Sequence, residues 1–220
     1  LPGKLLLRLD PHAIGGLSRG LDRSGVISAT NGKTTTAAMV ATILERGGAR
    51  LVSNRAGANM AGGVAGALLN DTGDTGLFEV DEFWLGPIVE ELRPDALLLA
   101  NLFRDQLDRY GELESIADRW AAVVAAGHAR SLVLNADDPL VADLGAQLPG
   151  TTFFGVEDRT LATAALQHAS DSTHCRRCGA PYVYEAVFLG HLGHYHCPNC
   201  DARRPPATVT AHHVTLEGVR

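Results

Sequence analysis

The sequence has little lysine, no excess of basic charge and no long apolar run. Its only lysines are Lys4 and Lys33, and its 19 basic and 25 acidic residues give a net charge of −6. Such a chain has no positive field to attract nucleic-acid phosphates, so we expect no nucleic-acid partner. No run is apolar enough to span a bilayer, and the first residues lack the order of a secretory signal. We therefore expect a cytoplasmic protein with no integral membrane segment.

The pattern of apolar residues predicts an α/β fold. The chain has 220 residues, 45% of them hydrophobic, which suffices for one α/β core and a small additional module. Short apolar runs alternate with longer helix-like stretches, as is typical of a parallel sheet covered by helices. In such sheets ligands bind beyond the carboxyl ends of the strands. Expected strands are 25–28, 50–53, 76–80, 96–100, 131–134 and 152–154, and expected helices are 34–46, 60–69, 113–126 and 139–146.

Changes in composition divide the chain into segments. We expect residues 24–157 and 205–220 to form the central domain, and residues 1–23 to pack on its core. Residues 158–204 are expected to form a linker and an inserted module, because this segment carries all four cysteines and several histidines. A strand-like pattern resumes at residues 209–219, and we expect more protein downstream of it.

The most informative motif is SATNGKTTT at residues 28–36, between an apolar run and a helix-forming segment. Backbone N–H groups at such a turn point at phosphates, a lysine neutralises their charge, and the next hydroxyl binds Mg²⁺. In a chain that otherwise avoids lysine, Lys33 supplies the compact ammonium that arginine does not imitate. The alternative is a helix start with an exposed lysine. The predicted ATP ligands of this loop are Thr30, Asn31, Gly32, Lys33, Thr34 and Thr35, with Thr34 also on Mg²⁺.

Two Cys-x-x-Cys pairs, separated by 18 residues, predict a zinc ribbon. Four thiolates leave no open coordination position, so the Zn²⁺ is expected to be structural. Two disulfides or a redox dithiol are the alternatives, and the lack of a secretion signal favours zinc. Nearby histidines at positions 174, 191, 194 and 196 are expected to be surface or hairpin residues. The predicted ligands are Cys175, Cys178, Cys197 and Cys200.

Further polar stretches follow the expected strands. The segment LFEVDE at 77–82 ends in carboxylates, which places an acid beside the Mg²⁺ of a nucleotide. Glu79 is the first candidate metal ligand, and a solvated acidic turn is the alternative. The stretch NLFRDQLDRYG at 101–111 is dense in polar residues, and LNADDP at 134–139 offers an amide and carboxylates for adenine and ribose. A helix cap explains Asp138 and the proline after it equally well.

Taken in order, these motifs resemble the central ATPase domain of the Mur ligase family, which joins amino acids to cell-wall precursors through an acyl phosphate. The loop ATNGKTTT (29–36), NRAGAN (54–59), DQLDRY (105–110) and the inserted ribbon are most similar to members that amidate lipid II. The resemblance covers essentially the whole chain. It implies catalytic roles for Lys33 and Glu79, Mg²⁺ binding by Thr34 and Glu79, and nucleoside contacts by Asn135 and Asp138. The residues implied to bind substrate are Asn54, Arg55, Asn59, Arg104 and Asp105.

The sequence departs from the wider family in two respects. Gln106 stands where many relatives carry a metal-binding histidine, and an amide is a poorer ligand for transition metals. Neither lysine is available for the carbamate by which many Mur ligases position metal. A second metal site and a carbamate are therefore not expected in this segment. The family also has a C-terminal domain that closes over ATP, and nothing in the sequence resembles it.

The resemblance implies an activity and a partner. ATP would phosphorylate the α-carboxylate of D-glutamate in the lipid II stem peptide, and ammonia would displace phosphate to give D-isoglutamine. Ammonia would come from a glutamine amidotransferase subunit in a heterodimer, acting at the inner face of the membrane through the lipid-linked substrate. The alternatives are a Mur-type ligase that adds an amino acid, and a P-loop and zinc-ribbon binding protein without catalytic activity.

Overall fold

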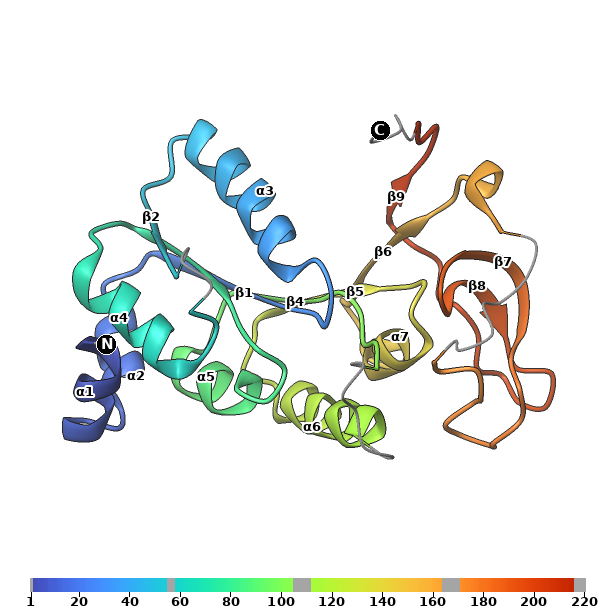
Figure 1. Cartoon of the computed structure of the whole chain (residues 1–220), viewed down its shortest axis with the longest axis horizontal. Coiled ribbons are helices and arrows are strands. Elements are labelled where there is room, and N and C mark those ends of the chain that lie inside the picture. The colour runs from blue at the N-terminus through green and yellow to red at the C-terminus, as the bar shows by residue number, and fades with distance from the viewer. Residues whose placement is uncertain (1, 55–57, 105–111, 164–170, 216–220) are drawn as a thin grey trace. The chain divides into compact units, whose positions relative to one another are not determined.

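The computed structural model describes residues 2–54, 58–104, 112–163 and 171–215. The chain divides into two compact units, Leu1–Leu132 and Val133–Arg220, and the division falls within strand β5 (Ser131–Asn135). Most elements of both units are labelled in Figure 1. The division expected at residues 158 and 204 stays a prediction.

The first unit is built on parallel strands in the order β2-β3-β1-β4. Its central strands, the second and third in this order, carry buried apolar residues, with Val26, Ile27 and Phe78 at most 3% exposed. Burial on both faces explains why these strands read as continuous apolar runs. The strands are β1 (Arg23–Ser28), β2 (Leu51–Ser53), β3 (Thr75–Glu79) and β4 (Ala96–Leu99).

Helices cover both faces of this sheet. Helix α3 (Lys33–Arg46) lies on one face, and α4 (Ala61–Asn70), α5 (Leu85–Leu92) and α6 (Glu112–Ala126) lie on the other (Figure 1). Gly47 ends α3, and Gly48 after it has a φ of 93°, a left-handed conformation typical of glycine after a helix. Two short helices from the N-terminal segment, α1 (Pro2–Leu9) and α2 (Ala13–Ser18), pack on α4.

The second unit combines parallel strands with an antiparallel hairpin. Strands β5, β6 (Thr152–Val156) and β9 (Val209–Ala211) pair in parallel, accompanied by α7 (Pro139–Gly145) and a 3₁₀ turn, η1 (Arg159–Leu161). Strands β7 (Val183–Leu189) and β8 (Leu192–His196) form the hairpin between the cysteine pairs. The chain therefore leaves β6, builds the hairpin and returns to pair with β6.

The predicted parallel α/β fold is confirmed. Each expected strand and helix is present, with ends that differ from the prediction by no more than two residues. Among the described residues, α1, α2 and α5 were not predicted, because each is short and contains glycine, and α1 and α5 also contain proline in the first turn. In the part of the chain that the structure describes, no helix has the length and apolarity needed to cross a membrane.

Candidate functional site

The predicted phosphate loop connects β1 to the N-terminus of α3. Gly32 immediately precedes the helix with a φ of 76°, a left-handed conformation that suits glycine. A Cβ at Gly32 would meet no atom within 4 Å, so the loop is open at this point. The helix N-terminus carries no side-chain cap from this residue, which leaves its N–H groups available to an anion. Thr35 lies exposed in the first turn.

Lys33 is held within the loop and is not an exposed lysine. Its Nζ donates to the Ala29 carbonyl oxygen at 3.0 Å and to Oε2 of Glu82 at 3.3 Å. The Lys33 and Glu82 side chains are 15% and 10% exposed. The alternative of a helix start with a solvated lysine is therefore wrong. Glu82 was not among the predicted ligands, although it belongs to the acidic stretch that ends β3.

Glu79 lies at the end of β3 and is 6% exposed, so the alternative of a solvated acidic turn is wrong for this residue. Thr34 Oγ1 donates to Glu79 Oε1 at 2.9 Å. Asn54 fixes the backbone there: its Nδ2 donates to the Glu79 carbonyl at 2.7 Å, and its Oδ1 accepts from the Glu79 N–H at 3.0 Å. Thr34, Asn54 and Glu79 line a cavity of about 200 Å³. The hydroxyl and carboxylate oxygens are of the kind that Mg²⁺ prefers.

The segment after β4 is bound to the phosphate loop. Asn101 Oδ1 accepts from the Asn31 N–H at 2.9 Å, and Asn101 Nδ2 donates to the Asn31 carbonyl at 3.0 Å. Thr30 Oγ1 accepts from the Phe103 N–H at 3.1 Å. Asn101 thus holds the loop, and the sequence signal for it was its position as the first polar residue after β4.

Of the remaining predicted substrate ligands, the structure describes Asn59 and Arg104. The Asn59 carbonyl accepts from the Asp81 N–H at 2.8 Å, which joins the segment after β2 to the segment after β3. Arg104 is exposed. Arg55, Asp105 and Gln106 lie outside the described residues. The roles assigned to all of these residues stay predictions.

In the second unit, Asn135 ends β5 and Asp138 begins α7. Asn135 is 7% exposed, and its Oδ1 accepts from the Asp137 N–H at 2.9 Å. Asp138 is fully buried, and its Oδ1 accepts from the N–H groups of Leu140 and Val141 at 2.9 and 3.3 Å. Asp138 is therefore a helix cap, as the alternative interpretation predicts. Burial raises the pKa of the neighbouring Asp137 carboxyl, although the Val156 N–H and Arg204 act in the opposite direction.

The four cysteines lie together as the sequence predicts. Their sulfur atoms lie within 4.8 Å of one another, and the Cys175–Cys200 and Cys178–Cys197 pairs are 3.6 and 3.4 Å apart. All four are free, so the alternative of two disulfides is wrong. Zn–S bonds of about 2.3 Å in a tetrahedron would place the sulfur atoms about 3.8 Å apart, so the set fits zinc.

The surroundings of this cysteine cluster also suit a metal. Hydrogen bonds from the Asn199 side chain, the Ala180 N–H and Cys197 lower the pKa of the Cys178 thiol to about 6. A thiolate is the form that binds metal. Gly179 follows the first pair with a φ of 75°, a left-handed conformation that suits glycine.

The histidines near the cluster differ in exposure. His191 and His194 belong to the hairpin, as expected, but they are 0% and 7% exposed. A surface position is therefore wrong for these two. His196 ends β8 and its side chain is 42% exposed, while His174 is exposed.

The motifs and their placement match one family of enzymes. The model of the Mur ligase middle domain matches residues 27–202. The chain belongs to the Mur ligase family. Among curated proteins it is 30% identical over 210 residues to the MurT subunit of lipid II isoglutaminyl synthase (glutamine-hydrolyzing) from Staphylococcus aureus (strain N315). That similarity covers 94% of this chain and 47% of the relative, so the chain spans about half the length of the curated relative.

Solved structures of Mur ligases have the same fold. A pseudomurein peptide ligase type C from Methanothermus fervidus has a TM-score of 0.73 and 28% identity, over 88% of this chain and 39% of that chain. A MurF ligase from Thermotoga maritima, in complex with ADP, has a TM-score of 0.56 and 23% identity, over 70% of this chain and 37% of that chain. The second similarity bears on the fold alone.

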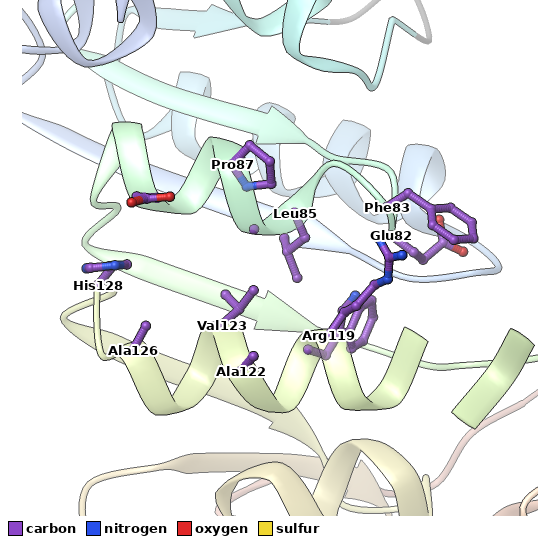
Figure 2. Close-up of a pocket in the computed structure, with 12 residues that line it drawn as sticks. Glu82, Phe83, Leu85, Pro87, Arg119, Ala122, Val123, Ala126 and His128 are labelled. Carbon is purple, nitrogen blue, oxygen red and sulfur yellow. The ribbon is translucent and has the colours of Figure 1, made fainter. Parts of the chain in front are cut away.

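This Mur ligase chain has a further pocket, of about 400 Å³, between α5 and α6 (Figure 2). Arg119 lies over the Phe83 ring, 5.6 Å from its centroid, at the end of the pocket near Glu82. His128 lies at the other end. None of the ligands predicted from the sequence is among its lining residues. Its apolar walls come from two helices, of which α5 was not predicted, so the pocket was not predicted either.

Proposed function

We propose that this chain is the central ATP-binding part of an amidating Mur ligase, the synthetase subunit of a lipid II isoglutaminyl synthase. The observation that carries the proposal is a contact of Thr34, the residue after Lys33. Its hydroxyl donates to the buried Glu79 carboxylate. The lysine and hydroxyl at the start of α3 and the carboxylate at the end of β3 would form a site for Mg-ATP. Similarity to a MurT subunit over 94% of the chain supports this choice of reaction.

The reaction would proceed through an acyl phosphate. An oxygen of the D-glutamate α-carboxylate in the lipid II stem peptide attacks the γ-phosphorus of ATP, and ADP leaves. Ammonia then attacks the carbonyl carbon, phosphate leaves with the transferred oxygen, and a proton is lost to give the carboxamide of D-isoglutamine. Conversion to the acyl phosphate makes the carbonyl open to attack.

The residues of the loop have separate roles in this scheme. Lys33 would exchange its contacts with Ala29 and Glu82 for the phosphates and neutralise charge on the transferring group. Thr34 and Glu79 would hold Mg²⁺, which supplies charge stabilisation to the β- and γ-phosphate oxygens when bound. The family resemblance assigns the nucleoside to Asn135 and Asp138, and the precursor to Asn54, Arg55, Asn59, Arg104 and Asp105.

Ammonia requires a separate source. The relative is named as a subunit of a glutamine-hydrolyzing enzyme, so we propose a heterodimer with a glutamine amidotransferase subunit. The four cysteines gather in one cluster. If they bind zinc as we propose, no thiol in this chain is left for glutamine hydrolysis. We propose a cytoplasmic location, with action at the inner face of the membrane on the lipid-linked substrate.

The test is mass spectrometry of lipid II after incubation with the full-length protein, Mg-ATP, and either ammonium or the glutaminase with glutamine. A change from carboxylate to carboxamide is expected. The Lys33→Ala variant should remain folded and lose turnover, because no other side chain of the loop carries positive charge. Retained turnover in that variant would refute the assignment of the site.

A second candidate is a Mur-type ligase that adds an amino acid. Its support is the similarity to a peptide ligase at 28% identity and a TM-score of 0.73. A screen of amino acids as co-substrates, run beside the ammonium reaction, distinguishes the two. Addition of an amino acid without carboxamide would favour this second function.

A further inference from the structure

The loop that follows β5 is joined to the cysteine ribbon by a buried polar network within the second unit. This loop, residues 135–138, carries Asn135, to which the proposed function assigns the nucleoside. Asp137 and Asp138 are only 3% and 0% exposed. Two buried carboxylates need specific partners, since an unpaired buried charge is strongly unfavourable. The partners come from the ribbon.

The first partner is His191, at the turn between β7 and β8. Its Nε2 lies 3.2 Å from Asp138 Oδ2, and both side chains are 0% exposed. The other carboxylate oxygen of Asp138 caps α7. The Asp138 carboxylate therefore joins helix α7, which follows the loop, to the hairpin of the ribbon. The Tyr184 hydroxyl donates to the His191 carbonyl at 2.9 Å, which fixes the turn.

The second partner is Arg204, which follows the second cysteine pair. Its Nε donates to Asp137 Oδ1 at 2.7 Å and its Nη1 donates to Glu157 Oε1 at 2.8 Å. Gly155 leaves room for this pair, because a Cβ there would lie 2.5 Å from Arg204 Nη2 and 2.9 Å from Asp137 Oδ1. The arginine side chain is 10% exposed, so the pair is shielded from solvent.

The network reaches Asn135 through the backbone. The Gly193 N–H, in β8, donates to the Asp137 carbonyl at 2.9 Å. The Asp137 N–H in turn donates to Asn135 Oδ1 at 2.9 Å. The orientation of the Asn135 amide therefore depends on where Asp137 is held. The ribbon holds Asp137 at its carbonyl and at Oδ1, and the Val156 N–H of β6 holds Oδ2 at 2.8 Å.

We propose that the ribbon is a positioning element for the nucleoside, in which His191 and Arg204 hold the loop 135–138 so that Asn135 presents its amide to the base. The inference rests on the proposed function for the nucleoside role of Asn135. In this proposal the ribbon holds the loop 135–138 in place in addition to binding its metal. Removal of either basic side chain takes one partner from a buried carboxylate, which keeps backbone N–H donors (Leu140 and Val141 for Asp138, Val156 for Asp137), so the loop is held by fewer contacts.

The experiment compares two ligands of the zinc-loaded full-length protein by calorimetry. ATP tests the nucleoside and phosphate contacts together, whereas inorganic tripolyphosphate tests the phosphate contacts alone. His191→Ala and Arg204→Ala are expected to bind ATP about tenfold more weakly, the size typical when a residue that orients a ligand-binding group is lost. Their affinity for tripolyphosphate should equal that of the wild type.

Matched controls come from the same segment. His196→Ala removes a hairpin histidine whose side chain is 42% exposed and contacts Glu185 at the surface. Arg203→Ala removes the exposed neighbour of Arg204. Both controls should leave both affinities unchanged. If His191→Ala loses zinc, His191→Gln replaces it, because an amide still donates to Asp138 and should keep ATP binding near the wild-type value.

Amide hydrogen exchange supplies a readout that does not depend on ATP. Peptides covering residues 133–140 should exchange faster in His191→Ala and Arg204→Ala than in the wild type and in both controls. ATP binding as in the wild type, or an equal loss of ATP and tripolyphosphate affinity, would overturn the proposal. If the wild type itself binds no ATP, the proposed function fails separately, and unchanged exchange in 133–140 would then overturn the positioning role.

Discussion

At the scale of single residues, Gly32 sets the conformation of the phosphate loop. Its φ of 76° costs a residue with a Cβ about 1–2 kcal/mol. Gly32→Ala should lower the free energy of unfolding by that amount, measured by urea denaturation, although no atom lies within 4 Å of the added methyl group. Gly16→Ala in α2 is the matched control, because its Cβ also meets nothing and its backbone is helical. Equal stability of the two variants would contradict the backbone argument.

His12 offers a second test at this scale. A hydrogen bond and the charge of Glu91, whose Oε1 lies 2.6 Å from His12 Nδ1, raise the pKa of His12 above 6.5. Because the folded pKa exceeds the unfolded value, the contribution to stability is present below about pH 6.5 and is lost as pH rises through the folded pKa. An NMR titration should show the raised pKa, and Glu91→Gln should lower it. A His12 pKa that is unchanged by Glu91→Gln would show that the pair does not form in solution.

At the scale of elements, the crossing of α1 and α4 depends on glycine. A Cβ at Gly3 would overlap the Gly62 carbonyl oxygen, whereas a Cβ at Gly66 would lie 3.8 Å from the Gly3 nitrogen, an ordinary contact. Gly3→Ala should therefore reduce stability by about 1–3 kcal/mol, as overpacking does. Gly66→Ala should be neutral or slightly stabilising, because alanine favours helix. Thermal unfolding of both variants tests this prediction. A Gly3→Ala variant as stable as the wild type would mean that α1 does not pack on α4 at Gly3.

The elements also show what the sequence reveals and what it hides. Strands such as β1 and β3 were predictable because both of their faces are buried, which leaves unbroken apolar runs. Helix α5 carried a signal, since Leu85, Ile88, Val89 and Leu92 are buried at helical spacing. Gly86 and Pro87 interrupt that pattern, yet proline is tolerated in the first turn.

At the scale of the whole molecule, the unpredicted features are contacts between residues far apart in the chain. The lysine of the loop was predictable from local spacing, but its pairing with Glu82, 49 residues away, was not. The His191–Asp138 pair spans 53 residues and depends on how the hairpin folds back onto the loop after β5. Local patterns fix which residues end strands, whereas tertiary packing decides which of them are buried and paired.

If the cysteine cluster binds zinc, the stability of the second unit depends on the metal. Binding energy at a structural site is folding energy, because the unfolded chain has no preformed site. Metal analysis should find one zinc per chain, and a strong chelator should lower the thermal midpoint of unfolding. Cys178→Ser should lower the thermal midpoint by a similar amount. The chelator should not lower the midpoint of this variant further, because its metal site is already lost. A purified chain without stoichiometric zinc would refute the site, and an unchanged midpoint after zinc removal would show that the cluster does not support the fold.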